Sequence, residues 1–250
     1  MVLISAIILT KNEEKNIARC LNSVGPIADE IIIVDSGSTD KTLDIAREYT
    51  KKIFVNPWQN DFASQRNYAL QKTTGEWVLS IDADEELPAE LAEEIKQFLA
   101  SNKSRDYAGM RVPRKNIIFG KWLRHGESWP DLQLRLFRSG NYYRRAVHEV
   151  LDLQGQVGLF KNPILHYPYE NTKQFIARAD RYTEIEAEVL IKEKPNPHFW
   201  EMLAYPLAKF INVYFIKMGF LDGIRGLLFC GLLGYYSFQK RYKYWLKAHA

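Results

Sequence analysis

The sequence predicts an α/β fold, with a mostly parallel central sheet flanked by helices and a helical C-terminal segment. Two observations predict the sheet: four short apolar runs in the first 82 residues alternate with helix-like stretches, and β-branched residues are frequent in these runs. The third observation is a change of composition near residue 193, after which aromatic and apolar residues dominate. A chain of 250 residues with 46% hydrophobic content can bury a core of this size.

The four apolar runs are expected to form parallel strands joined by right-handed crossovers. They cover residues 2–9, 30–34, 52–55 and 77–81, and the helix-like stretches begin near Glu13, Asp40 and Ala63. Ligands of such sheets bind beyond the C-terminal ends of the strands. The residues directly after the runs, 10–14, 35–40 and 82–86, are therefore the first place to look for chemistry.

The rest of the chain is expected to complete the fold in three parts. A helix should run from Pro88 to about Leu99, and another from Thr172 to about Lys192. Between them, residues 106–169 are strand-like and irregular, typical of a mixed sheet with binding loops. This organisation divides the chain into three parts, residues 1–105, residues 106–192 and an amphipathic helical segment (193–250).

Two carboxylates, Asp82 and Asp84, lie two residues apart where the fourth apolar run ends. A hard cation such as Mg²⁺ or Mn²⁺ takes few carboxylates and accepts phosphate oxygens, so this pair can present it to a nucleoside diphosphate. Asp35 ends the second run and precedes a hydroxyl-rich turn. Its carboxylate can bind a ribose hydroxyl or a base edge, and Ser38 either joins these contacts or caps the next helix.

The order of these motifs resembles the signature of family 2 glycosyltransferases. The motifs are Thr-Lys-Asn-Glu at 10–13, Val-Asp-Ser-Gly-Ser-Thr-Asp at 34–40, Gln-Arg-Asn at 65–67 and Asp-Ala-Asp at 82–84. Gln-Leu-Arg-Leu-Phe at 133–137 and Val-His-Glu at 147–149 extend the resemblance to the subgroup with lipopolysaccharide inner-core β-glucosyltransferases. The resemblance implies the GT-A fold and an inverting, metal-dependent hexosyltransferase. It also implies that residues 1–105 are the nucleotide-sugar-binding half and residues 106–192 the acceptor-binding and catalytic half.

Roles for individual residues follow from this resemblance. Thr10, Asn12, Glu13 and Asp35 would hold the nucleoside, usually uridine. Arg66 would approach the diphosphate, although a surface ion pair on a helix is an alternative. Asp82 would contact the ribose or the metal, and Asp84 the metal directly.

An inverting transfer also needs a carboxylate that takes the proton from the acceptor hydroxyl. Asp131, after Trp129 and Pro130, and Glu149, after His148, are the two candidates, with Asp131 preferred. His148 is a candidate metal ligand or phosphate contact, against a purely structural role. The strand period places Gln133 and Arg135 on one face, from which both can reach the nucleotide sugar.

Basic residues are concentrated at the C-terminus. Seven Lys or Arg and one Asp follow Leu203, which gives this segment +6 in a chain of net charge +4, so the first 202 residues sum to −2. A basic, aromatic segment favours an anionic membrane surface over nucleic acid. Its longest uncharged run has fourteen residues, whereas a spanning helix needs about 18 to 20. We therefore expect helices in the interface, anchored by a belt of Tyr, Trp, Lys and Arg between 235 and 247.

Packing of these helices on the catalytic domain, or at a homodimer interface, is the alternative. The absence of a basic stretch before the first apolar run argues against a secretory signal, and two widely separated cysteines suit a reducing compartment. We expect a cytoplasmic protein, peripheral on the inner face of the plasma membrane.

The leading hypothesis is transfer of a hexose, glucose from UDP-glucose, to a lipid-linked or lipopolysaccharide-core saccharide. One alternative is a polyprenyl-phosphate sugar synthase, which needs no general base because a phosphate attacks. The other is a noncatalytic nucleotide-sugar-binding membrane scaffold, which measurable turnover would exclude.

Overall fold

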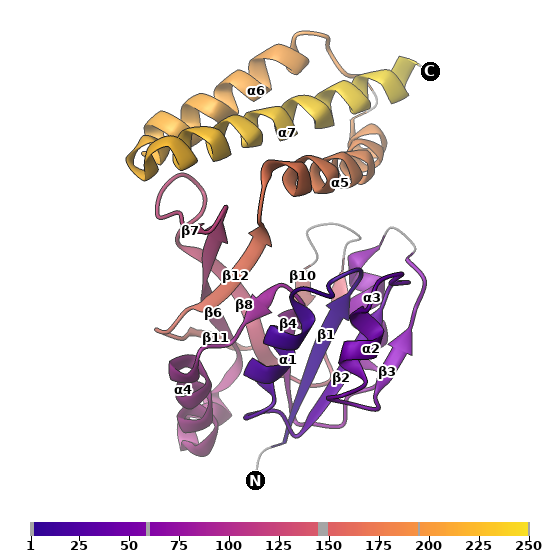
Figure 1. Cartoon of the computed structure of the whole chain (residues 1–250), viewed down its shortest axis with the longest axis vertical. Coiled ribbons are helices and arrows are strands. Elements are labelled where there is room, and N and C mark those ends of the chain that lie inside the picture. The colour runs from indigo at the N-terminus through magenta and orange to yellow at the C-terminus, as the bar shows by residue number, and fades with distance from the viewer. Residues whose placement is uncertain (1–2, 59–60, 145–149, 195, 250) are drawn as a thin grey trace. The chain divides into compact units, whose positions relative to one another are not determined.

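The computed structural model describes residues 3–58, 61–144, 150–194 and 196–249, shown in Figure 1. The chain forms two compact units. The first unit is Met1–Arg114 with Leu132–His166, and the second is Lys115–Asp131 with Tyr167–Ala250.

The strands are β1 (Ile4–Thr10), β2 (Glu30–Asp35), β3 (Ile53–Val55), β4 (Trp77–Asp82), β5 (Glu85–Glu86), β6 (Tyr107–Ile118), β7 (Lys121–Trp122), β8 (Asp131–Arg138), β9 (Tyr142–Arg144), β10 (Val150–Asp152), β11 (Gln156–Leu159) and β12 (Ile164–Tyr169). The α-helices are α1 (Ile17–Val24), α2 (Thr42–Ala46), α3 (Phe62–Leu70), α4 (Ala89–Ala100), α5 (Thr172–Glu193), α6 (Glu201–Ile211) and α7 (Gly223–His249). Shorter helical turns are η1 (Asn102–Asp106), η2 (Asn212–Ile216) and η3 (Gly219–Asp222).

The N-terminal half of the sheet is parallel, as the alternating pattern predicts. The sheet has the order β3-β2-β1-β4-β8-β6-β12-β5, and β1 pairs in parallel with both β2 and β4. In this register Thr10 lies opposite Asp35, and Leu9 lies opposite Asp82. Three polar strand ends therefore meet at one edge of the sheet.

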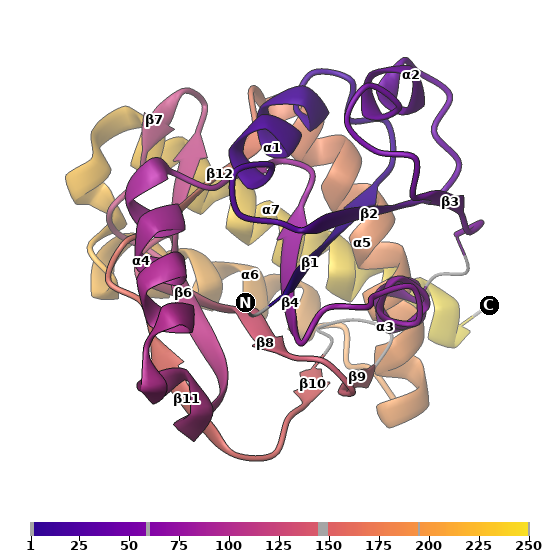
Figure 2. The same cartoon turned by 90° about the horizontal axis from the view of Figure 1, so that it is seen from below.

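Helices cover both faces of this parallel half (Figures 1 and 2). Because side chains alternate along a strand, Ile8 packs in the core that includes α1, α2 and α4, whereas Ile7 packs in the core that includes α3. Strands buried on both faces read as continuous apolar runs. This is why the run from Ile4 to Ile8 shows no polar alternation apart from the buried Ser5.

The second half of the sheet is mixed, as expected for the irregular region 106–169. β8 runs antiparallel to β4, and β12 runs antiparallel to the two-residue strand β5. β6 and β12 each begin in the first unit and end in the second, where β7 pairs with the end of β6. β9 and β10 form a separate antiparallel pair.

The second unit is built on α7, against which both α5 and α6 pack (Figure 1). In the described part of the chain, no helix is both long enough and apolar enough to cross a membrane. Several residues of the predicted belt between 235 and 247 bond within this unit, and the membrane role of the belt stays a prediction. Its internal bonds include those from Tyr236 to Glu186, from Tyr244 to the carbonyl of Lys194, and from Arg241 to Glu201.

Candidate active site

The polar residues after β1 and β2 form a single hydrogen-bonded loop cluster in the first unit. Asp35 is fully buried, and its Oδ2 accepts hydrogen bonds from the amides of Gly37 and Ser38, both at 2.8 Å. The Ser38 hydroxyl donates to the other Asp35 oxygen and accepts from the Asn12 amide at 2.8 Å. The Asn12 side chain makes a further contact with this turn, since its Oδ1 accepts a hydrogen bond from the Thr39 amide at 2.8 Å.

Backbone geometry explains the residue choice in this cluster. Asn12 has a φ of 56°, a left-handed conformation that Asn tolerates better than most residues. Gly37 has a φ of 95°, which suits the turn that brings two amides onto Asp35. Glu13 joins the cluster through its amide, which donates to the hydroxyl of Thr42 at 2.8 Å.

Thr10 leaves a polar atom available at this edge. Its side chain is 4% exposed, and its hydroxyl has no hydrogen-bond partner within the described ranges. Buried hydroxyls without partners are rare because no hydrogen bond offsets the free-energy cost of removing them from water. A ligand that hydrogen-bonds between the ends of β1 and β2 would satisfy this group.

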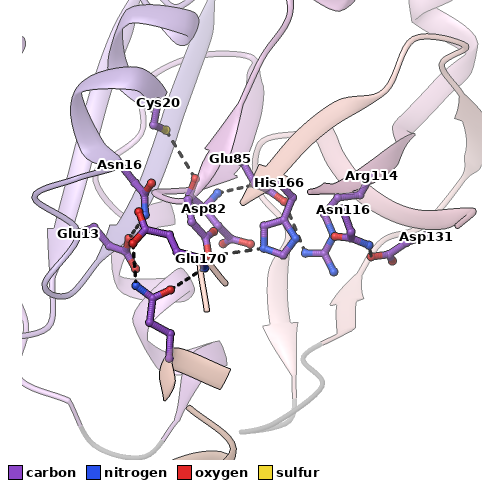
Figure 3. Close-up of polar contacts among 12 residues, drawn as sticks. Glu13, Asn16, Cys20, Asp82, Glu85, Arg114, Asn116, Asp131, His166 and Glu170 are labelled. Carbon is purple, nitrogen blue, oxygen red and sulfur yellow. Dashed lines mark hydrogen bonds and ion pairs between the residues drawn. The ribbon is translucent and has the colours of Figure 1, made fainter. Parts of the chain in front are cut away.

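The second cluster joins carboxylates and arginines at the end of β4, and Figure 3 shows three of its members, Asp82, Glu85 and Arg114. Asp82 accepts from Arg66 at 2.9 Å on one oxygen and from Arg135 at 2.6 Å on the other. Arg135 also pairs with the fully buried Glu85, which lies 3.5 Å from Arg114. Two carboxyl groups and three guanidinium groups therefore lie together in this cluster.

Electrostatics hold Asp82 and Arg135 in their charged forms. Burial alone would raise the pKa of Asp82, but Arg135, Arg66 and Arg114 outweigh it and hold that pKa well below its usual range. Burial would lower the pKa of Arg135, but Asp82 and Glu85 raise it above its ordinary value. The contact between Arg66 and Asp82 is a partly buried pair, with side chains 9% and 28% exposed, whereas the alternative from sequence was a surface pair.

Asp84 has a different partner. Its side chain is 6% exposed, and its Oδ2 lies 3.5 Å from Nε2 of His166, a residue that β12 places beside β5. A carboxylate and an imidazole suit a divalent cation such as Mn²⁺ or Mg²⁺ when phosphate oxygens complete the shell. Among the residues described, no group of three or more His, Cys, Asp and Glu side chains could hold a metal ion.

The remaining predicted site residues are distributed as follows. Gln133 is half-buried on β8, on the same strand as Arg135. Asp131 belongs to the second unit, where Asn116 donates to its carboxylate at 3.3 Å and to the carbonyl of Ser128 at 3.0 Å. Glu149 and His148 lie outside the described residues.

Sequence reasoning missed Glu85, Arg114 and His166. Glu85 stood in the acidic run after β4 without a spacing that set it apart, and Arg114 was one arginine among many in the strand-like region. His166 lies 82 positions after Asp84 in the chain and reaches it only through the pairing of β12 with β5. A lone histidine before Tyr167 carried no signal of its own.

The mostly parallel sheet with polar residues at its carboxyl edge is an α/β fold of the GT-A type. The family described as glycosyl transferase family 2 matches residues 5–162. The chain therefore belongs to glycosyl transferase family 2.

Relatives along most of the chain support this membership. An uncharacterized glycosyltransferase of Rickettsia conorii is 31% identical over 90% of this chain and 83% of its own length. The lipopolysaccharide core biosynthesis glycosyltransferase LpsC of Rhizobium meliloti is 30% identical over 93% of this chain and 85% of its own length. The solved structure of S. aureus TarS 1–349 matches 97% of this chain and 89% of its own with a TM-score of 0.50 at 16% identity, which shows likeness of fold.

Proposed function

We propose that this chain transfers a hexose, glucose from UDP-glucose, with inversion to a lipid-linked or lipopolysaccharide-core saccharide. The observation that carries the proposal is the meeting of two clusters at one sheet edge, the Asp35 loop cluster and the Asp82 network, with the Thr10 hydroxyl beside Asp35. This is the edge where ligands of α/β sheets bind.

The loop cluster is proposed to hold the nucleoside. Thr10, Asn12, Glu13, Asp35 and Ser38 all belong to this edge. Because Asp35 and Asn12 already shape the loop through backbone amides, the contact surface is set before the donor arrives, which lowers the ordering cost of binding.

The arginines of the Asp82 network are proposed to meet the diphosphate. Arg66 is held by Ser80 at 2.9 Å and by Asp82, so its guanidinium is presented at the strand end. Arg135 keeps Asp82 ionised, while Gln133 on the same strand is proposed as a further donor contact.

Asp84 and His166 are proposed to hold Mg²⁺ or Mn²⁺, and Asp82 and His148 remain further candidates. When bound, the ion would neutralise the negative charge that develops on the leaving diphosphate. Both Asp82 oxygens already accept from arginines, which favours Asp84 as the main carboxylate ligand.

The general base is proposed to be Asp131, with Glu149 as the alternative. The hydrogen bond from Asn116 fixes the orientation of the Asp131 carboxylate. Likeness to LpsC, whose name places it in lipopolysaccharide core biosynthesis, supports a core saccharide as acceptor. The functional division at 105 and 192 remains a proposal with these assignments.

The test is a panel of nucleotide sugars incubated with Mn²⁺ or Mg²⁺ and a lipopolysaccharide-core acceptor. Asp84→Asn removes one charge from the site and should abolish transfer. Asp44→Asn serves as the matched control, because Asp44 is an exposed residue of α2 that pairs with Arg47.

The expected result is metal-dependent transfer from one UDP-hexose, retained in the control and lost in Asp84→Asn. Transfer to a polyprenyl phosphate instead of the saccharide would replace the acceptor proposal. Full activity of Asp84→Asn would refute the role of Asp84.

A further inference from the structure

The turn between α6 and α7 carries an exposed apolar surface. Nine large apolar side chains between 211 and 228 are exposed, and Ile224 (77%) and Ile216 (70%) are the most exposed. We call the nine residues the apolar tip: Ile211, Phe215, Ile216, Met218, Phe220, Leu221, Ile224, Leu227 and Leu228. Single exposed apolar side chains are common on proteins, but a contiguous group of this kind marks an interaction surface.

The interior of this turn is closed to larger side chains. A Cβ on Gly226 would lie 2.1 Å from the carbonyl oxygen of Gly219, and a Cβ on Gly219 would lie 2.6 Å from Sγ of Cys230. The backbones of η3 and α7 therefore touch through two glycines. With the interior filled in this way, the bulky side chains of the turn must face outward.

The single acidic residue of the turn, Asp222, is buried and accepts hydrogen bonds from neighbouring backbone amides. Asp222 is 8% exposed and accepts hydrogen bonds from the amides of Arg124 and His125, at 3.0 and 2.8 Å. The two other charged residues between 211 and 228, Lys217 and Arg225, are both exposed cations. Lys217 also contacts Glu127 at 2.9 Å.

Apolar side chains flanked by cations match the chemistry of an anionic bilayer interface. Phosphate headgroups attract lysine and arginine, and the acyl boundary accepts phenylalanine, isoleucine and leucine. A symmetric contact with a second copy would set Arg225 of one copy near Arg225 of the other, and the one acid between 211 and 228, Asp222, is buried.

We propose that the apolar tip inserts into the interfacial region of an anionic membrane, with Lys217 and Arg225 at the level of the phosphates. This proposed contact lies at the opposite end of α7 from the predicted belt at 235–247. This membrane binding requires no sugar donor or acceptor, so it can be tested separately from the proposed sugar transfer.

The test is co-sedimentation of the whole chain with phosphatidylcholine vesicles and with vesicles that also contain phosphatidylglycerol. The variant is Ile216→Asp with Ile224→Asp, which places two anions at the most exposed positions. The matched control is Leu246→Asp with Phe199→Asp, since both residues are exposed and apolar (42% and 63%) but lie outside the tip. Circular dichroism checks that all three proteins are folded.

Wild type and control should bind the anionic vesicles, and the tip variant should bind at least about tenfold more weakly. Added salt should weaken wild-type binding, because headgroup attraction is screened. Lys217→Gln with Arg225→Gln should reduce binding to anionic vesicles more than to neutral ones. Equal binding by tip variant and wild type, or no vesicle binding by wild type, would overturn the proposal. A wild-type dimer that only the tip variant loses would assign the surface to self-association instead.

Discussion

Replacing Arg135 with Met should destabilise the protein far more than the loss of an exposed arginine. Arg135 is 4% exposed and pairs with Asp82 and Glu85, and both carboxylates would lose this partner. Breaking a buried ion pair costs about 3 to 5 kcal/mol, because the remaining charge stays poorly solvated. Asp82 keeps Arg66 at 2.9 Å and Glu85 keeps Arg114 at 3.5 Å, so we expect the lower end, about 3 kcal/mol.

Equilibrium unfolding in urea, followed by circular dichroism, measures this loss. Arg47→Met is the control, since the exposed pair of Arg47 with Asp44 should contribute less than about 1 kcal/mol. The difference between wild type and Arg135→Met should depend on pH. The pKa of Asp82 is lowered in the folded wild type, so its stabilisation is complete above its unfolded pKa and is lost as pH falls toward the folded value.

The gap between wild type and Arg135→Met should therefore narrow below about pH 4. If Arg135→Met and Arg47→Met lose the same stability at neutral pH, the buried network does not hold this part of the fold together. A gap that is constant from neutral to acidic pH would mean that Asp82 is not the group that Arg135 stabilises.

Three further results are expected. Asp35→Asn should weaken UDP binding, measured by calorimetry, about tenfold and lower the free energy of unfolding by about 1 to 3 kcal/mol, because the Asp35 carboxylate accepts two backbone amides. An unchanged UDP affinity and an unchanged free energy of unfolding would contradict this expectation. Hydrogen bonds from Lys52, Ser5 and Thr74 outweigh burial and lower the pKa of Glu30 to about 2. The stability advantage of wild type over Glu30→Gln should therefore be full above about pH 4.5 and vanish toward pH 2. Urea titrations at each pH measure this advantage. Asp222→Ala should speed hydrogen exchange at the amides of residues 124 and 125, and unaltered exchange there would mean that Asp222 does not protect these amides by accepting their hydrogen bonds.

The parallel half of the fold was predictable because local pattern determines it. β1, β2 and β4 are largely buried on both faces, so they appear as short apolar runs, and the helices between the strands follow polar turns. Their parallel pairing places the residues after each run at one edge. The contact of Thr10 with the Asp35 strand therefore follows from the sequence alone.

The partners within the site were less predictable because antiparallel pairing brings in distant segments. β5 has only two residues, too few for a periodic signal, yet its pairing with β12 brings His166 to Asp84. The double pairing of Asp82 with Arg66 and Arg135 likewise depends on α3 and β8 packing against β4. The internal bonds of the C-terminal belt were not predictable for a related reason, since composition cannot show which face of α7 contacts α5 and α6.

The most direct test of the account is a calorimetric titration of UDP into the protein with Mn²⁺ present. Wild type and Asp44→Asn should bind UDP in Mn²⁺ and lose at least about tenfold in affinity with a chelator, because an ion held by Asp84 would neutralise charge on the diphosphate. Asp84→Asn should show the weak affinity under both conditions. Equal, metal-independent affinity in wild type and Asp84→Asn would contradict the claim that this sheet edge is a metal-assisted nucleotide-sugar site.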